Sequence, residues 1–290
     1  MECILNKVDP QFDTTLGLQY RLSILLGQNG FSFLVTHAIS KKILVLESYR
    51  SNHSEIKHSE KGWPSNGNDY FYHLNKNTLS HLIYQKVDIA VASYKTTLAP
   101  HNFLLPGNEF AVMSVAHTVI ESEEILTESL FDQGPVVAIA IPKFIREQCN
   151  ILFPQAAFRC APAVFVKGVL RRHSDMIARQ IFLNVFNGYF EMCVIQGSRL
   201  LYLNAFRYSA PSDVLYYVIF VLEQLGFVPS EENITLMGEI SDSETVFNQL
   251  KVYCASLRYA KRPEGIVYDE TFAGVHIHNY FTLLNIPLCE

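Results

Sequence analysis

The chain has 290 residues, of which 49% are hydrophobic and 18% charged, and its formal net charge is −5. This composition is that of a globular protein long enough for two domains, and it excludes an intrinsically disordered chain. The acidic balance argues against nucleic-acid binding, which usually needs a surplus of positive charge. Residues 1–10 lack the features of a signal peptide, and no segment has the apolar length of a transmembrane helix. We therefore expect a cytoplasmic protein with no nucleic-acid partner and no transmembrane segment.

Three apolar segments near the N-terminus predict a meander of antiparallel strands. They span 20–26, 31–37 and 43–49, and Asn29-Gly30 between the first two is typical of a tight hairpin turn. Nearly every position of these strands is apolar, so we expect both faces of their sheet to be covered. The polar segment 51–69 that follows is predicted to be an exposed loop.

The next segments predict alternating helices and strands, with one ambiguous stretch. Apolar residues at helical spacing predict a helix over 77–85, and the run VDIAVAS predicts a buried strand over 87–93. Residues 96–134 mix short apolar runs with an acidic segment at 121–130 that favours a helix. The apolar run at 136–141 predicts a further buried strand.

The same order of elements recurs in the second half of the chain. With Gly30 aligned on Gly188, three strands are again predicted, now joined at the first turn by Asn187-Gly188. The predicted elements are strands at 181–186, 189–195 and 200–206, a helix at 213–225, a strand at 233–237, a helix at 243–250 and a strand at 251–258. An internal repeat of this size predicts two lobes of the same topology.

Two lobes of this kind, each a mixed sheet with helices on its faces, define the predicted fold. It is an α/β fold of duplicated ribonuclease-H-like lobes, the architecture of the actin-like ATPases. We assign residues 1–172 to the first lobe and 173–275 to the second, with a hinge near 173–179. By analogy, we expect a C-terminal helix within 276–290 to pack back on the first lobe.

Several short motifs resemble a bacterial family of proteins of unknown function. They are Leu22-Ser23-Ile24, Gly30-Phe31-Ser32-Phe33, Asn187-Gly188-Tyr189-Phe190-Glu191, Leu200-Leu201-Tyr202-Leu203-Asn204, Asp213 with Tyr216-Tyr217, Leu236-Met237-Gly238 and Leu288-Cys289-Glu290. The resemblance covers most of the chain and is weakest between residues 51 and 134. That family is distantly similar to the actin-like proteins of type IV pilus assembly and of cell division. The resemblance implies a fold but no activity, because functional sites are grafted onto folds.

The resemblance also indicates where a nucleotide would bind. Actin-like ATPases hold ATP and Mg²⁺ between their lobes, where glycine N–H groups of two hairpin turns clasp the phosphates and a third, glycine-rich turn approaches the adenosine. The corresponding positions are candidate nucleotide-binding residues if this chain binds ATP with Mg²⁺: Gly27, Asn29, Gly30, Asn187, Gly188 and Gly238.

Three features of these turns depart from an ATPase. The first turn contains no Asp, Phe186 stands where the second turn's Asp would fall, and Glu239 replaces a glycine of the third turn. A carboxylate about 4 Å from a bound phosphate would cost roughly 4 kcal/mol at an effective dielectric constant near 20.

These departures predict a pseudo-ATPase with no catalytic residues and no cofactor. Such a protein would act as a scaffold or interaction protein with an unknown protein partner. One alternative is an ATP-binding assembly factor similar to the pilus-assembly or cell-division proteins. Another is an enzyme of a different class that uses the same cleft, such as a small-molecule kinase.

Two carboxylates each have a functional and a structural interpretation. Glu191 could replace a missing metal ligand in the cleft, or it could face solvent or pair with a neighbouring basic residue. Asp213 could be a cleft carboxylate, or it could belong to the first turn of a helix, where negative charge suits the helix dipole.

Aromatic and metal-ligand motifs receive structural interpretations. We expect Tyr216 and Tyr217 to pack in the core, with a partner-binding aromatic patch as the alternative. His276-x-His278 has no Cys or carboxylate cluster beside it, so we predict no metal site there and a closing helix over 276–286. The six cysteines are scattered, without C-x-x-C spacing, and are predicted to be free thiols.

Overall fold

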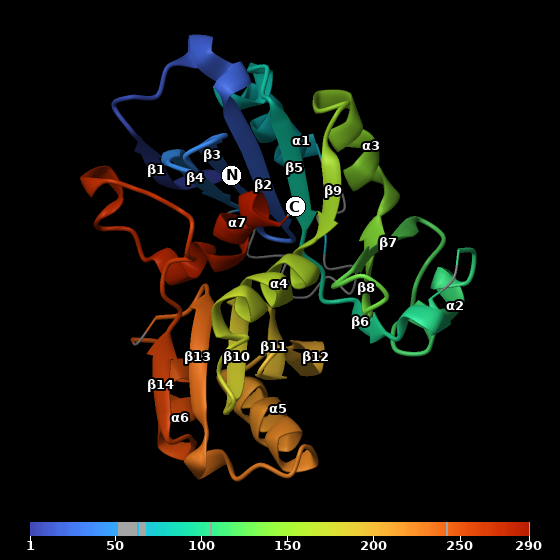
Figure 1. Ribbon diagram of the computed structural model, residues 1–290. Helices are drawn as coiled ribbons and strands as arrows, with labels where there is room; N and C mark the ends of the chain where they lie inside the picture. The colour runs from blue at the N-terminus through green and yellow to red at the C-terminus, as the bar shows by residue number, and fades with distance from the viewer. Residues whose placement is uncertain (52–62, 64–67, 105, 242, 290) are drawn as a thin grey trace.

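The computed structural model describes residues 1–51, 63, 68–104, 106–241 and 243–289 (Figure 1). Two large sheets are stacked end to end in this view, and a small third sheet projects to the side of the first. Between the large sheets lie two helices, α4 (Ala161–His173) and α7 (Phe281–Asn285).

The first sheet has six strands in the order β1-β4-β3-β2-β5-β9. Its strands are β1 (Glu2–Val8), β2 (Tyr20–Gly27), β3 (Gly30–His37), β4 (Ile43–Arg50), β5 (Lys86–Val91) and β9 (Ala157–Cys160). The predicted meander forms the antiparallel set β2, β3 and β4, while β5 pairs parallel to β2 and β9 parallel to β5. Strand β1 adds an unpredicted antiparallel strand at the edge beside β4.

The second sheet repeats this arrangement in five strands, in the order β12-β11-β10-β13-β14. Its strands are β10 (Arg179–Phe186), β11 (Tyr189–Gln196), β12 (Arg199–Arg207), β13 (Asn233–Gly238) and β14 (Ser256–Tyr259). The first three strands are antiparallel, and β13 and β14 continue in parallel, as β5 and β9 do in the first sheet. The predicted duplication is therefore confirmed.

The predicted alignment of the two hairpins is wrong by one residue. Gly27 pairs with Gly30 across the first hairpin, and Phe186 pairs with Tyr189 across the second. Gly30 therefore corresponds to Tyr189 rather than to Gly188, because strand register, and not the position of a glycine, defines equivalent sites.

The ambiguous segment 96–134 contributes to a small sheet in the order β6-β8-β7, inserted between β5 and β9. Its elements are β6 (Thr96–Ala99), α2 (Glu109–Ser114), β7 (Glu123–Ser129) and β8 (Val136–Pro142). The buried strand predicted at 136–141 is confirmed as β8. The prediction for the acidic segment at 121–130 is wrong, because it forms strand β7 rather than a helix.

Ion pairs to distant residues explain the strand at β7. Glu123 binds Lys95, with 2.7 Å between Oε1 and Nζ, and Glu128 binds Arg159, with 2.6 Å between Oε1 and Nη2. These partners lie outside the segment, so its local helix propensity is overridden by tertiary contacts.

The helices of the first lobe also differ from expectation. The predicted helix at 77–85 is reduced to a short 3-10 turn (Thr78–His81), and Ile83 is 76% exposed. Besides α2 and α4, the regular helices are α1 (Asn68–Lys76) and α3 (Lys143–Leu152). Most of the loop predicted at 51–69 lies outside the described residues, but Trp63 within it is buried, so the loop is not exposed throughout.

Alternate faces of the second sheet are covered by different helices. Ile181, Leu183 and Val185 of β10 pack with α5 (Pro211–Gln224) and α6 (Thr245–Tyr253), whereas Phe182 faces the core that contains α4. Residues 251–253, predicted to start a strand, end α6 instead. Within the described residues, no helix has the length and apolar character needed to cross a membrane.

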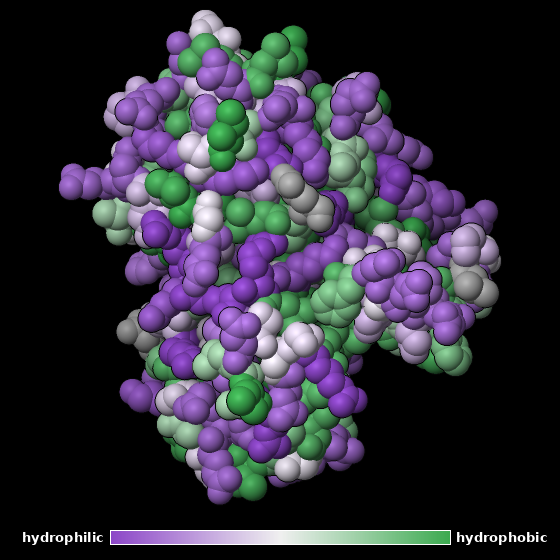
Figure 2. Space-filling model, in the orientation of Figure 1, coloured by the Kyte–Doolittle hydropathy of each residue, from purple (hydrophilic) through white to green (hydrophobic). Residues whose placement is uncertain are grey.

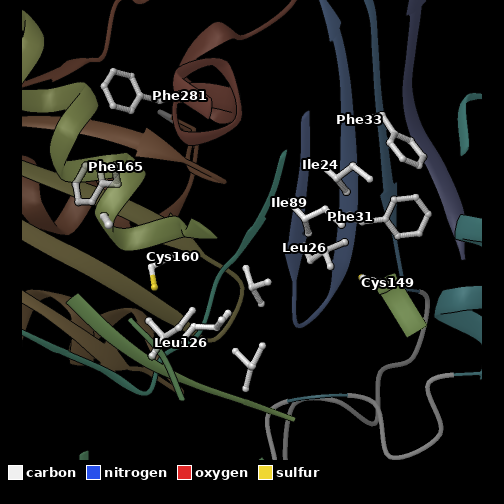
Figure 3. Close-up of a cluster of buried hydrophobic side chains, with 14 of the residues drawn as sticks. Ile24, Leu26, Phe31, Phe33, Ile89, Leu126, Cys149, Cys160, Phe165 and Phe281 are labelled. Atoms are coloured by element: carbon white, nitrogen blue, oxygen red, sulfur yellow. The ribbon is translucent and has the colours of Figure 1, made fainter. Parts of the chain in front are cut away.

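The two lobes share a buried apolar core around α4 and α7 (Figure 3). Phe165 of α4 and Phe281 of α7 join a cluster that contains Phe31 and Phe33 of the first sheet and Phe182 of the second. The predicted closing helix at 276–286 is present only as the single turn α7, with 3-10 turns on either side. The segment α7 packs against α4, β2, β3 and β13, and thereby touches both large sheets.

Candidate functional site

The candidate nucleotide-binding turns lie where the two lobes meet. Gly27 and Gly30 close the β2–β3 hairpin, and Gly30 also lies opposite the end of β4, where any Cβ would overlap the Tyr49 carbonyl oxygen. The Gly30 carbonyl accepts a 3.0 Å hydrogen bond from the Tyr70 hydroxyl. The glycine at position 30 is therefore required by strand packing, whether or not a phosphate binds.

The two hairpin turns are joined directly to one another. The Asn29 side-chain amide donates a 2.9 Å hydrogen bond to the Asn187 backbone carbonyl, from Nδ2 to O. The turns of the two lobes are therefore in direct contact, with no ligand-sized space between Asn29 and Asn187.

Gly188 and Gly238 both adopt left-handed backbone conformations. Their φ angles are +88° and +82°, a region that other residues enter only with strain. Space surrounds Gly188, whereas Gly238 is held tightly beside β10 because the Glu239 amide donates a 2.7 Å hydrogen bond to the Val185 carbonyl. Neither glycine lines the cavity that remains between the turns.

That cavity has a volume of about 60 Å³ and is lined by Gly27, Gln28, Asn29, Gly30 and Asn187 among others. Small-molecule sites usually enclose roughly 300–1,000 Å³, so a nucleotide cannot enter without separation of the lobes. Two buried polar atoms of its wall, Gln28 Nε2 and Tyr189 Oη, have no hydrogen-bond partner among the residues that the structure describes. A cavity of this size with unpaired polar groups suits ordered water.

The charges at the cavity cancel. Of the described residues in its wall, only Arg50 and Glu239 carry a charge, and the Arg50 Nη2 to Glu239 Oε2 distance is 2.7 Å. This ion pair connects β4 of the first lobe to the turn after β13 in the second. The repulsion expected between Glu239 and a phosphate is therefore offset by a neighbouring cation. Because Arg50 and Glu239 neutralise one another, neither side chain is available to bind a phosphate or Mg²⁺.

Aromatic packing replaces the acidic position of the second turn. The Phe186 and Tyr189 rings stack with centroids 4.7 Å apart and an interplanar angle of 8°. Tyr189 is only 2% exposed, and burial raises the pKa of its hydroxyl well above the ordinary value. The turn is thus built as a packed aromatic corner, without a carboxylate that could position a metal or a water molecule.

The Arg50–Glu239 pair makes a measurable but small contribution to stability. Both side chains remain about two-fifths exposed, at 44% and 40%, and ion pairs of this kind contribute about 0.2–1 kcal/mol. We expect a double-mutant cycle of Arg50→Gln and Glu239→Gln, measured by urea unfolding at low salt, to give a coupling energy in that range. The coupling should decrease at 1 M salt, since salt screens exposed charges. A coupling that is absent at low salt would contradict this assignment.

Glu191 is the carboxylate whose environment differs most from expectation. It is completely buried on β11, directly opposite Asn184 of β10, so it does not face solvent. No basic residue of the described chain forms an ion pair with it. Asn184 Nδ2 donates hydrogen bonds to Glu191 Oε2 at 2.9 Å and to Thr282 Oγ1 of α7 at 3.2 Å. Burial raises the pKa of Glu191 to about 8. We call Asn184, Glu191 and Thr282 the interlobe polar cluster.

The interlobe polar cluster does not form a metal site. Its only carboxylate is Glu191, and its other ligands are one amide and one hydroxyl. Among the residues that the structure describes, no group of three or more His, Cys, Asp or Glu side chains could hold a metal ion. Glu191 therefore offers no support for the interpretation as a replacement metal ligand.

Asp213 has the structural role that its helix position indicates. Its carboxylate accepts hydrogen bonds from the backbone amides of Ser209 and Ala210, at 2.8 and 2.9 Å, and these bonds lower its pKa. It therefore caps the start of α5 from outside the cleft. The helix begins at Pro211, two residues earlier than predicted.

The two tyrosines of α5 have different environments. Tyr217 packs against the core of the second lobe and stacks on Phe206, as predicted. Tyr216 is 62% exposed and stacks instead on Phe220, which is itself 46% exposed. The core interpretation is thus wrong for Tyr216, because its helical position points away from the sheet.

His276 and His278 are structural as well. The rings are 5.8 Å apart, and His278 stacks on Tyr259 at 4.1 Å and contacts the Ile240 carbonyl through Nε2 at 3.0 Å. Burial lowers the pKa of His278.

All six cysteines are free, as predicted.

Three residues of the site were missed by the sequence analysis: Arg50, Asn184 and Thr282. The sequence signal for Arg50 is its place at the end of a strand that leads to the first turn. Asn184 carries a signal too, as a polar residue inside an otherwise apolar strand. Thr282 carries none, because its role depends on the return of α7 to the lobe boundary.

The duplicated sheets and the interlobe position of the three turns define a protein of the actin-like ATPase fold. A Bacteroides thetaiotaomicron protein of unknown function with this fold matches with a TM-score of 0.80 and 20% identity, over 97% of this chain and 100% of that chain. The chain belongs to the DUF3822 family of proteins of unknown function, whose model matches residues 9–257. The predicted family resemblance and fold are therefore confirmed.

More distant structures share the same fold. A type IV pilus biogenesis complex, PilM–PilN, matches with a TM-score of 0.62 and 11% identity, over 94% of this chain and 98% of that chain. The ethanolamine utilization protein EutJ from Carboxydothermus hydrogenoformans matches with a TM-score of 0.50 and 10% identity, over 97% and 92% of the two chains. Comparison with curated protein sequences finds no significant match. These likenesses establish the architecture and leave the activity open.

Proposed function

We propose that this protein is a non-catalytic actin-like protein that acts by binding another protein. The observation that carries the proposal is the direct contact between the two hairpin turns, from Asn29 Nδ2 to the Asn187 carbonyl. The cavity of about 60 Å³ and the internally neutralised Arg50–Glu239 pair support it. A closed body of this kind offers its outer surfaces, and not its cleft, for function.

A protein partner fits the surface better than a nucleic acid does. The net charge of −5 disfavours a polyanion, whereas Tyr216 and Phe220 expose stacked aromatic rings on α5. Tyrosine and phenylalanine are enriched at protein interfaces. The fold shared with a pilus biogenesis complex is consistent with a protein partner. We place this activity in the cytoplasm.

The second candidate function is an ATP-binding assembly factor whose lobes open to admit Mg-ATP. It is favoured by the unpaired donors Gln28 Nε2 and Tyr189 Oη, which would face a ligand if the turns separated. In that case Gly27, Asn29, Gly30, Asn187, Gly188 and Gly238 would surround ATP and Mg²⁺. The missing carboxylates would still leave hydrolysis without a group to position the metal or the attacking water.

Calorimetric titration with ATP and Mg-ATP distinguishes these two functions. We expect no binding at millimolar nucleotide for the natural protein. We expect the same result for Asn29→Ala, which removes the hydrogen bond between the turns. Binding of Mg-ATP by Asn29→Ala alone would favour a closed nucleotide site, and micromolar binding by the natural protein would overturn the proposed function.

A further inference from the structure

A second cavity, of about 150 Å³, lies between the C-terminal end of α4, the second sheet and α7. It shares no lining residue with the cavity between the hairpin turns. Its apolar wall includes Phe182 of β10, Met237 of β13 and Phe281 of α7. Figure 2 shows hydrophilic residues gathered across the middle of this face, where α4 lies in Figure 1.

Three cations line the same cavity, namely Arg172, Arg258 and Lys261, and its described wall contains no carboxylate. The two arginines bind only neutral acceptors among the described residues. Arg172 Nη1 donates to the Arg262 carbonyl at 2.7 Å. Arg258 donates to Thr235 Oγ1 at 3.1 Å and to Gln180 Oε1 at 2.9 Å. Their positive charges are therefore not neutralised by the described part of the chain.

His173 reports the same electrostatic environment. Its imidazole lines the cavity and packs on Phe182 with 4.9 Å between ring centroids. Burial, followed by the nearby Arg172 and Arg258, lowers its pKa to about 4. Within the described part of the chain, no negatively charged group opposes this effect on its pKa. The ring is consequently neutral at pH 7 and leaves the cationic groups as the charged part of the wall.

We propose that this cavity binds a small organic anion. Its carboxylate or phosphate group would lie among Arg172, Arg258 and Lys261, because guanidinium groups bind both anions through paired hydrogen bonds. Its hydrocarbon body would lie on Tyr259 and Ala260, the partly exposed apolar residues of the wall, because Phe182, Met237 and Phe281 are at most 4% exposed. A volume of about 150 Å³ is comparable to that of a cavity that holds benzene. Such a ligand would contact α4 and the second sheet together.

Phenyl phosphate is a suitable probe, because it combines one aromatic ring with one phosphate. We expect saturable binding of phenyl phosphate to the full chain by calorimetry, at least tenfold tighter than binding of inorganic phosphate or phenol. The affinity should fall with added salt, since the contact is ionic. Binding should also move the ring resonances of His173 in the NMR spectrum and raise the pH at which they titrate.

Two variants locate the binding site. Arg258→Gln and Lys261→Gln should each weaken phenyl phosphate binding at least tenfold. Lys261 is exposed, so we expect Lys261→Gln to fold. This variant therefore keeps the test valid even if Arg258→Gln does not fold. The matched controls are Arg199→Gln, on the exposed end of β12, and Arg50→Gln, at the other cavity, and both should leave the affinity unchanged.

Three results would overturn the proposal. One is the absence of phenyl phosphate binding at millimolar concentration. Another is equal affinity for phenyl phosphate and inorganic phosphate, which would show that the apolar wall makes no contribution to binding. The third is binding that Lys261→Gln and Arg258→Gln leave unchanged. None of these results depends on whether the hairpin turns bind a nucleotide, so this site and the proposed function can fail separately.

Discussion

Replacing Gly238 by alanine is expected to lower the free energy of unfolding by about 2–5 kcal/mol. The residue has a φ of +82°, and left-handed backbone costs other residues about 1–2 kcal/mol. In addition, a Cβ would overlap the Val185 carbonyl oxygen and lie 2.7 Å from the Val185 nitrogen. These are backbone atoms of a central strand, so they cannot move aside as a side chain would, and overpacking of this kind costs about 1–3 kcal/mol.

Gly226→Ala is the matched control for this prediction. Gly226 also has a positive φ, of +72°, but no atom lies within 4 Å of the position that its Cβ would occupy. We expect Gly226→Ala to lower the free energy of unfolding only by the cost of the left-handed backbone conformation, about 1–2 kcal/mol. Urea unfolding of both variants, followed by circular dichroism, measures the difference. Equal losses for the two variants would show that the close approach of β13 to β10 is unimportant.

The stability of the protein is expected to fall between pH 5 and pH 8, because Glu191 is buried in its neutral form. Burial raises its pKa from 4.5 to about 8 in the folded chain. Across this interval the unfolded chain releases the proton and the folded chain keeps it. The folded state therefore binds more protons, and raising the pH favours unfolding. At 1.36 kcal/mol per pH unit, the loss amounts to roughly 3–5 kcal/mol.

The isosteric variant Glu191→Gln tests this assignment. It removes the titrating group and retains an oxygen that can accept the hydrogen bond from Asn184 Nδ2. We expect the unfolding free energy of this variant to vary less between pH 5 and pH 8, and to exceed that of the natural protein at pH 8.

The control is Glu223→Gln, at an exposed position of α5, which should reproduce the pH dependence of the natural protein. Parallel pH profiles for the natural protein and Glu191→Gln would mean that Glu191 does not titrate in this range. Urea unfolding at half-unit pH intervals provides the profiles.

Both predictions concern the same small region. A Cβ on Gly238 would also lie 2.9 Å from Asn184 Oδ1, so the turn after β13 and the interlobe polar cluster pack against one another. Thr282 brings α7 into the same contact. The turn after β13 is thus held by close backbone packing on β10 beside a neutral polar cluster. This agrees with a body whose lobes are held together without a nucleotide.

The sequence by itself determined the duplicated topology. Both meanders consist of short strands joined by tight turns, such as Asn29-Gly30 and Asn187-Gly188, and such hairpins are specified by neighbouring residues. The strand ends and turns were predicted to within about two residues for this reason. The absence of an acidic residue from the first turn and the presence of Phe186 in the second were also visible in the sequence alone.

Only the tertiary structure determined the conformation of segments whose side chains contact residues far away in the sequence. The segment 121–130 has a helical composition, but Lys95 and Arg159 hold its carboxylates along a strand. The helix expected at 77–85 is replaced upstream by α1, where Tyr70, Phe71 and Leu74 are buried. Local propensity differs by less than about 1 kcal/mol per residue, and such contacts readily outweigh it.

The same reason applies to the site. The sequence predicted which turns would meet, but not that Asn29 would bind Asn187 or that Arg50 would neutralise Glu239. It also did not predict that Thr282 of α7 would accept a hydrogen bond from Asn184. Each of these contacts joins residues far apart in the chain. Their formation depends on how the two lobes pack around α4, and that packing is set by the shared apolar core, not by any local pattern.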